Sequence, residues 1–224
     1  MSSEVDICNL ALGLIGDKAA VSSISPPDQS AQAGHCARFY PIARDALQEL
    51  HPWGFCTRRV ALALSANDPP SSWQYAYIGP SGVLNYLAIR APDATDDWAS
   101  EVPLTNSLNG IGFAARTSIY DPQPFVVETN DLDEDVIYTN QVDAVLQYTT
   151  RVTDTTKFSP LFISTLSYML AHYLAGPIIK GAEGRQVSSE MLKMAMGFMG
   201  KATTSDANQR RTTIAQSVPW MANR

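Results

Sequence analysis

The sequence predicts an α+β protein: a helical bundle built from both the N- and C-terminal segments, with an inserted antiparallel β-sandwich or barrel module and an extended C-terminal arm. Apolar residues recur at helical spacing before Gly54, at a spacing of two in the middle of the chain, and at helical spacing again after Asp154. Each helical half buries too little surface alone, so we expect the halves to pack together. The expected divisions are 1–54 with 154–204 for the bundle, 55–153 for the β module and 205–224 for the arm.

Two helices are expected at the start of the chain. Ser3 is suited to cap the first, and Gly16 to stop it. Its apolar stripe is formed by Ile7, Leu10, Ala11, Leu14 and Ile15. The second helix is expected from about Ser30 to Leu50, before His51-Pro52-Trp53-Gly54. Because Pro41 removes a backbone amide, we expect a kink near Ala37. Its seam contains several small residues, so a neighbouring helix can approach closely: Ala33, Cys36, Ala37, Tyr40, Ala43, Leu47 and Leu50.

Short strands separated by turns follow, as is typical of an antiparallel sandwich or barrel. The expected strands are Val60–Leu64, Trp73–Tyr77, Val83–Ile89, Phe113–Tyr120, Phe125–Thr129, Val136–Thr139 and Val142–Val152. The segment from Ala91 to Ile111 has no clear period, and we expect a long loop there.

The last two helices are expected from Pro160 to Gly176-Pro177 and from about Ser188 to Ala202, with Ser159 capping the first of them. The stretch between Lys157 and Lys180 contains no charged residue and is long enough to cross a bilayer. The Ser, Thr, His, Gly and Pro residues within this stretch favour a buried core helix instead.

Composition limits the classes of function. Charged residues make up 17% of the chain, against about 25% in an average soluble domain. We expect a solvent face rich in Ser, Thr, Asn and Gln, part of which is covered by other subunits. The net charge of −6 disfavours tight nucleic-acid binding but allows DNA to slide past. The odd number of cysteines (Cys8, Cys36 and Cys56), without a leader segment, predicts free thiols in a reducing compartment.

No catalytic motif stands out: there is no phosphate-binding Gly-rich loop, no nucleophile elbow and no zinc spacing of Cys and His. We therefore expect no enzyme activity, no cofactor and no metal. Cys36 is expected to be a buried structural thiol. We expect His51 to cap helix carbonyls and His172 to be a hydrogen-bonded core residue.

Three groups of residues are candidates for contacts. Glu128, Asp131, Asp133, Glu134 and Asp135 form an acidic run that reads as a solvated hairpin tip, as a weak calcium loop, or as an acidic lining facing a channel or nozzle. Met194 and Met196, beside Met191 and Met199, either pack in the core or adapt to a partner. The arm offers Arg210, Arg211, Pro219, Trp220 and Met221 for contacts with a neighbouring subunit.

Several stretches together resemble a known family. They are Ile7–Leu12 with Leu14-Ile15-Gly16, Trp53 and Phe55 before Arg58-Arg59, Trp73–Tyr77 before Pro80, and above all Leu146 to Ala175 with Tyr148, Arg151–Asp154 and Phe158–Phe162. In their order and spacing they resemble the tail tubular protein A family, the portal-to-tail adaptor (head-to-tail connector) of short-tailed phages, with departures at Ile78-Gly79 and in the Ala91 to Ile111 loop.

The resemblance implies a structural virion protein located in the tail next to the portal and assembled in the host cytoplasm. Its copies would form a dodecameric ring, with the portal protein on one side and the tail nozzle protein on the other. Genomic DNA would pass through the centre without specific binding during ejection, and no membrane is implied. Two other readings remain open: a tail-associated glycan hydrolase, which needs two carboxylates facing a cleft, and a small β-module binding protein.

Overall fold

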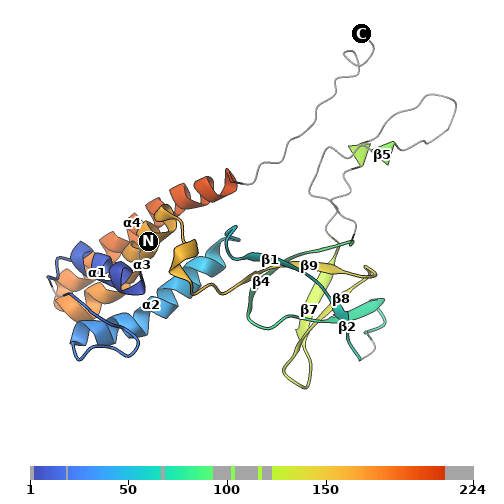
Figure 1. Ribbon diagram of the computed structural model, residues 1–224, viewed down its shortest axis with the longest axis horizontal. Coiled ribbons are helices and arrows are strands. Elements are labelled where there is room, and N and C mark those ends of the chain that lie inside the picture. Colours follow the sequence, from blue (N-terminus) through green and yellow to red (C-terminus); the bar gives the residue numbers. More distant parts are fainter. Residues whose placement is uncertain are drawn as a thin grey trace, which may run out of the picture. The chain divides into compact units, whose positions relative to one another are not determined.

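The computed structural model describes residues 3–18, 20–66, 69–92 and 123–209, and the backbone of Val102–Pro103 and Arg116–Thr117. These residues form two compact units (Figure 1). The helical unit comprises the described residues up to Thr57 together with Thr149–Gln209, and the strand unit comprises those from Arg58 to Tyr148. The protein is thus of the α+β class, as the sequence predicted. The divisions fall at Thr57 and Tyr148, whereas we expected them at Gly54 and Thr153.

The helical unit contains α1 (Glu4–Leu14), α2 (Ala31–Leu50), the short 3-10 helix η1 (Thr155–Lys157), α3 (Pro160–Ile179) and α4 (Gly181–Ala207). Three of the helices begin at serines named from the sequence. The hydroxyl oxygens of Ser3, Ser30 and Ser159 accept the backbone N–H three residues later, at 3.1, 3.1 and 3.2 Å. This contact satisfies one of the amides that the first turn leaves unpaired. The predicted caps at Ser3 and Ser159 are confirmed, and Ser30, expected only as the approximate start of α2, caps that helix in the same way.

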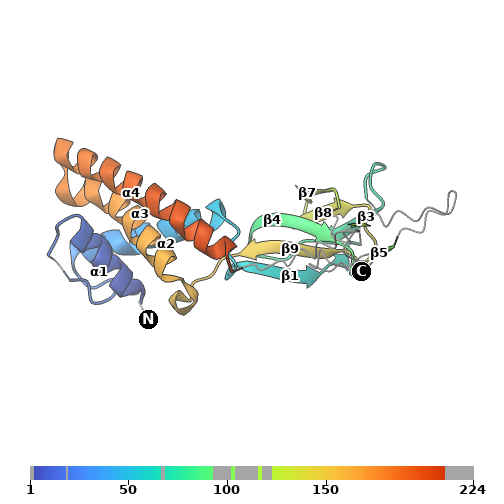
Figure 2. The same ribbon diagram turned by 90° about the horizontal axis from the view of Figure 1, so that it is seen from above.

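The core of the helical unit lies around α3, which contacts α1, α2 and α4 (Figure 2). Phe162, Leu166, Leu170 and Leu174 are fully buried there. By length and composition α3 passes the test for a membrane span, with a mean hydropathy of 1.3, but half of that window is buried inside the fold. The helix is a buried core helix, as the sequence predicted.

The reversal between α3 and α4 differs from the expectation in two ways. Gly176-Pro177 does not end α3, which continues to Ile179; the N–H of Lys180 reaches the carbonyl of Gly176 at 3.1 Å and closes the last turn. The next helix begins at Gly181 rather than near Ser188. The chain turns through left-handed backbone at Lys180 (φ 63°) and Gly181 (φ 66°).

The two chain halves of the helical unit are also joined by a buried side-chain amide. Gln48 of α2 donates from Nε2 to the carbonyl of Val152 at 2.7 Å and accepts the N–H of Val152 on Oε1 at 3.0 Å. A side-chain amide in this arrangement replaces a strand partner and leaves no buried backbone group unpaired. The two residues lie 104 positions apart, so this contact fixes the first half of the chain against the second.

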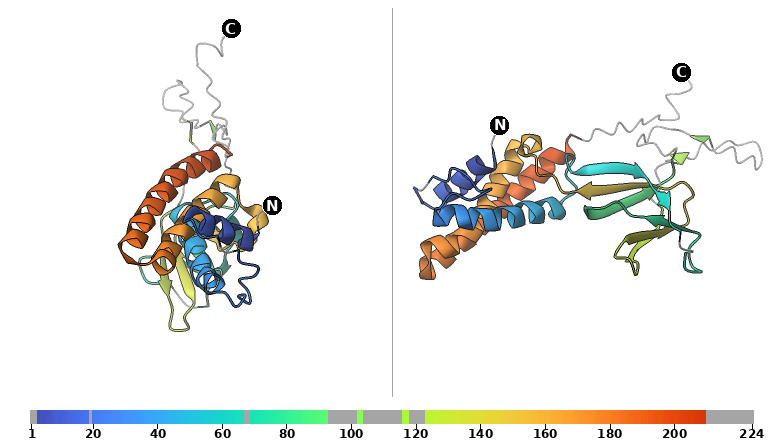
Figure 3. Two further views of the ribbon diagram at one scale, coloured as in Figure 1. Left: turned by 90° about the vertical axis from the view of Figure 1, so that its left-hand side faces the viewer. Right: turned by 60° about the horizontal axis from the view of Figure 1, so that its bottom comes forward.

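The strand unit contains two larger antiparallel sheets (Figure 3), besides a pair of two-residue strands described below. One has the order β1-β9-β4, and the other has the order β2-β3-β8-β7. The strands are β1 (Thr57–Ala61), β2 (Ala63–Leu64), β3 (Tyr75–Ile78), β4 (Val83–Arg90), β7 (Phe125–Thr129), β8 (Asp135–Thr139) and β9 (Val145–Thr150). Both sheets contribute to one core cluster, with Tyr77 and Ile137 from the second sheet and Ile89 and Leu146 from the first. Two sheets sharing a core is the arrangement of a sandwich.

The middle of the chain differs from the expected long loop. Within the Ala91 to Ile111 segment, Val102–Pro103 form strand β5, which pairs antiparallel with β6 at Arg116–Thr117. The loop prediction is therefore wrong at those two residues. β6 lies inside the strand expected over Phe113–Tyr120, and the rest of both segments lies outside the described residues.

Candidate functional site: assembly surfaces

The acidic run lies at a hairpin that joins β7 to β8. Asn130 organises the loop, because its Oδ1 accepts the N–H groups of Leu132 and Glu134, each at 2.9 Å. The N–H of Asn130 in turn reaches the carbonyl of Glu134 at 2.9 Å. Asp133 adopts a left-handed φ of 57°, a conformation that Asp tolerates better than most residues. The loop is therefore a tight, self-bonded turn, as the hairpin reading predicted.

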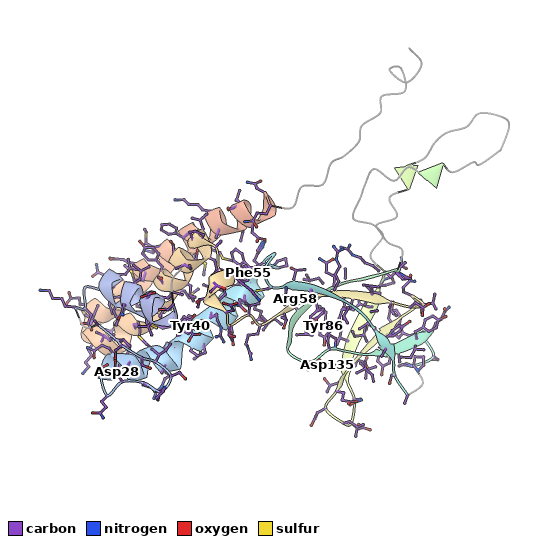
Figure 4. The ribbon with its side chains drawn as sticks, in the orientation of Figure 1. Asp28, Tyr40, Phe55, Arg58, Tyr86 and Asp135 are labelled. Atoms are coloured by element: carbon purple, nitrogen blue, oxygen red, sulfur yellow. The ribbon has the colours of Figure 1, made fainter. Side chains whose placement is uncertain are left out.

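The five acidic residues do not form one group. Glu128, Asp131, Asp133 and Glu134 are exposed, whereas Asp135 is half-buried. The Tyr86 hydroxyl of β4 donates to Asp135 Oδ2 at 2.6 Å, and so links the two sheets (Figure 4). Burial, and then this hydrogen bond, raise the pKa of Tyr86 above its usual range. Asp135 thus makes a structural contact that its four neighbours do not make, and the predicted position of the acidic run toward a channel or nozzle stays a prediction.

The four exposed carboxylates form an unbalanced negative surface. There is no Lys or Arg in the sequence between Arg116 and Arg151, so no cation on this stretch of chain offsets them. In the part of the chain that the structure describes, no three His, Cys, Asp or Glu side chains gather so that they could hold a metal ion. A surface of this sign repels a polyanion and attracts a cationic partner.

The methionines of α4 divide by their position around the helix. Met191 and Met199 pack against the core of the helical unit, on either side of the fully buried Ala195. Met194 and Met196 point outward and are 45% and 49% exposed. The core-packing prediction is confirmed for Met191 and Met199, whereas contacts of Met194 and Met196 with a partner stay a prediction. Residues two positions apart on a helix do not share a face, so these two methionines lie on opposite flanks of α4, and each exposes a flexible apolar side chain of the kind that adapts to partners.

Further apolar side chains of the helical unit are exposed, two of them at positions that the sequence placed in core stripes. Leu10 of α1 and Leu50 of α2 are 48% and 59% exposed, although their spacing placed them in the core stripes. Ile42 of α2 is also exposed. Periodicity identifies the apolar face of a helix, but not how far along that face a neighbour covers it.

Four aromatic rings from the stretches that carry the family resemblance form one cluster. The Phe162 ring lies 5.0 Å from that of Trp53, 5.1 Å from that of Phe55 and 4.8 Å from that of Phe158, measured between centroids. The indole N–H of Trp53 donates to the carbonyl of Leu47 at 2.8 Å, so the buried ring has a polar partner. The cluster fixes the exit from α2 against the start of α3.

Asp206 anchors the end of α4, a role that the sequence did not reveal. Its carboxylate accepts the N–H of Gly54 at 3.0 and 3.2 Å, and it lies 3.3 Å from His51 Nε2. The side chain of His51 therefore meets a carboxylate, and the expectation that it caps helix carbonyls was wrong. Because α4 continues to Ala207, residues 205–207 belong to the helix, and the expected arm begins too early.

The remaining Cys and His residues have structural surroundings. Cys8, Cys36 and Cys56 are fully buried free thiols. A hydrogen bond between Cys8 and Cys36, together with burial, raises the pKa of Cys8 far above its usual range, so its thiol stays protonated. His172 Nδ1 lies 2.9 Å from both the carbonyl and the hydroxyl of Ser188, which matches the predicted hydrogen-bonded core histidine.

Arg210, Arg211, Pro219, Trp220 and Met221 lie outside the described residues, and their predicted contacts stay predictions. A search of protein-family models finds no match for the chain, and a search of curated proteins finds no significant match.

Proposed function

We propose that this chain is a structural protein of a phage virion, a head-to-tail adaptor. Its copies form a ring between the portal and the tail nozzle, and the genome passes through the centre. The proposal rests on one observation above all. The residues of the family resemblance at Trp53, Phe55, Phe158 and Phe162 form the packed joint that closes a helical unit from both ends of the chain. These residues hold a particular architecture together, and they touch one another in the core.

The surfaces of the two units support the same proposal. The helical unit exposes apolar side chains on α1, α2 and α4, which suits contacts with neighbouring copies or with a portal. The hairpin of the strand unit exposes four carboxylates, which suits a ring through which DNA must move without adhering. The low content of charged residues is in keeping with a surface largely covered after assembly.

The test is the mass and shape of the assembled protein. The purified chain is examined by native mass spectrometry and electron microscopy, alone and mixed with the portal protein encoded in the same genome. The proposal expects hollow rings of many copies, formed on the portal or already in solution. Single copies without affinity for the portal would overturn it and favour a small binding protein. Cleavage of a cell-wall or capsule glycan by the clean chain would overturn it in favour of a hydrolase.

A pair of variants on α4 tests whether the exposed methionines take part. Met194→Lys with Met196→Lys puts one charge on each exposed flank of α4, and we expect ring formation on the portal to weaken at least tenfold. Ser189→Lys with Ala182→Lys adds the same charge at two exposed positions nearer the start of the helix. If both variants assemble equally well, the methionine surface makes no contact in the ring. Retained helical circular dichroism excludes misfolding as the cause.

A further inference from the structure

Strand β7 leaves one side of its sheet open. In the order β2-β3-β8-β7, β7 is a terminal strand, with β8 on one side and no described strand on the other. Natural edge strands are usually protected by Lys, Pro or a bulge. Phe125–Thr129 contains neither Lys nor Pro, and its pairing with β8 runs without a break from Phe125↔Thr139 to Thr129↔Asp135.

The hydrogen bonds around β8 show which groups of β7 face the open side. The N–H of Gly79 donates to the carbonyl of Asp135 at 2.7 Å. The backbone N–H and C=O groups of Asp135, and of every second residue after it in β8, therefore point toward β3. The N–H of Asn130 donates to the carbonyl of Glu134. The backbone groups of the remaining residues of β8 therefore point toward β7. In an antiparallel pair such bonding alternates along the strand. The backbone groups of Phe125, Val127 and Thr129 therefore face away from β8.

The surroundings of this open side are apolar and acidic. Val126 and Glu128 lie on the outer face of the sheet and are exposed, and the carboxylates of Asp131, Asp133 and Glu134 follow directly in the hairpin. An extended peptide that pairs with β7 would therefore find backbone partners along the strand and negative charge at the hairpin. The chemistry that fits is a basic segment with residues suited to a strand.

The chain's own C-terminal segment has this chemistry. Residues 210–224 contain Arg210, Arg211 and Arg224 and no acidic residue, and the run Thr212-Thr213-Ile214 up to Val218 is rich in residues that favour strands. Fully extended, a segment of this length reaches about 50 Å. It starts directly after Gln209, where the described part of the chain ends.

We propose that residues 210–218 add as a strand to the open side of β7 in a neighbouring copy, with Arg210 and Arg211 against the exposed carboxylates of the hairpin. This inference rests on the ring assembly proposed above, because it needs copies held side by side. Strand addition supplies affinity through backbone hydrogen bonds, and the charges set the direction and register. If every copy made this contact with its neighbour, each copy would be linked to the next around the ring.

A substitution at Thr129 tests the backbone contact in the full chain. Thr129→Pro removes an N–H that faces the open side, in an exposed residue, and Pro is tolerated on edge strands. Thr129→Ala removes the same hydroxyl but keeps the N–H, and is the matched control. We expect Thr129→Pro to weaken self-association at least tenfold in sedimentation velocity, and Thr129→Ala to leave it unchanged. Hydrogen exchange at Phe125 and Val127 should slow as the wild-type chain associates.

A charge exchange tests the identity of the occupant. Arg210→Glu with Arg211→Glu should weaken association, and so should Glu128→Arg with Asp131→Arg. Mixing the two variant chains should restore it, because the tail of one then matches the hairpin of the other. Restoration that weakens with added salt supports the proposal. Association that is insensitive to both charge changes overturns it.

The outcomes separate this inference from the proposed function. Rings on the portal that form equally well with Thr129→Pro would leave the adaptor standing and overturn the strand addition. Slowed exchange at Phe125 and Val127 that does not depend on protein concentration would place the segment on its own subunit, and would overturn docking on a neighbour. Hydrogen exchange at Phe125 and Val127 that slows only when portal or nozzle protein is added would mean that this partner pairs with β7, and would overturn docking of the C-terminal segment.

Discussion

Phe162→Ala is the change that most directly tests the joint of the helical unit. The side chain is fully buried, and truncation of a buried Phe to Ala costs about 3–5 kcal/mol of unfolding free energy. Its three aromatic neighbours, at centroid distances of 4.8 to 5.1 Å, contribute about 0.5–1.5 kcal/mol each beyond burial. These terms overlap, so we expect a loss near the upper end, about 4–5 kcal/mol. That is a large part of a typical stability of about 5–15 kcal/mol.

The assay is urea unfolding followed by far-ultraviolet circular dichroism at constant temperature. The four α-helices among the described residues lie in the helical unit, so their circular dichroism signal reports the unfolding of that unit. Phe162→Leu is the matched control, because it keeps most of the volume and should cost less than about 1.5 kcal/mol. A loss below about 2 kcal/mol for Phe162→Ala would refute the packed cluster. If the Ala variant does not fold, Phe162→Leu must still be measurably destabilised.

Three other predictions concern the helical unit. Asp206→Ala should lower the unfolding free energy by about 1.5–3 kcal/mol and speed hydrogen exchange in the last turn of α4, because Gly54 loses a charged acceptor; Asp206→Asn should cost less. Asp28 accepts hydrogen bonds from Ser30 and Ser22, which lower its pKa below the ordinary value of 3.8. Its stabilisation is thus present above that pH and lost as pH falls, so the difference in stability between wild type and Asp28→Asn should shrink in acid. The three cysteine thiols are buried and should react with a thiol reagent only after denaturation.

Features set by neighbouring residues were predicted well. The caps at Ser3 and Ser159 depend on a contact three residues away, which is visible in the sequence. The hairpin between β7 and β8 was predicted for a similar reason, since the alternating strands and the polar turn are local signals. The order of helices and strands followed from the change of period.

Features set by distant contacts were not predictable. The first turns of α4 read as a loop because they contain Gly181 and Gly184. A Cβ on Gly184 would lie 3.0 Å from the carbonyl of Ala175, so the small residue allows α4 to pack closely on α3. The part played by Asp206 depends on Gly54, 152 positions away, and no local pattern indicates that pairing.

The candidate surfaces were predicted only as groups. The sequence marked the acidic run and the methionines, but the separation of Asp135 from its neighbours depends on Tyr86, which belongs to the other sheet. Met194 and Met196 are exposed because Ala195, between them, is the residue that α4 turns toward the core. The open side of β7 became visible only with the strand order, because a sequence does not tell which strand lies last in its sheet.

The joining of residues 104 positions apart has a consequence for synthesis on the ribosome. The first two helices emerge long before the third, so their apolar faces stay uncovered while the whole strand unit is translated. The described part of the strand unit, Arg58 to Tyr148, is one continuous stretch of chain and is free to fold before α3 emerges. Closure of the helical unit is therefore a late event, and a chaperone that shields Ile7, Tyr40 and Leu47 until α3 arrives would raise the yield of folded protein.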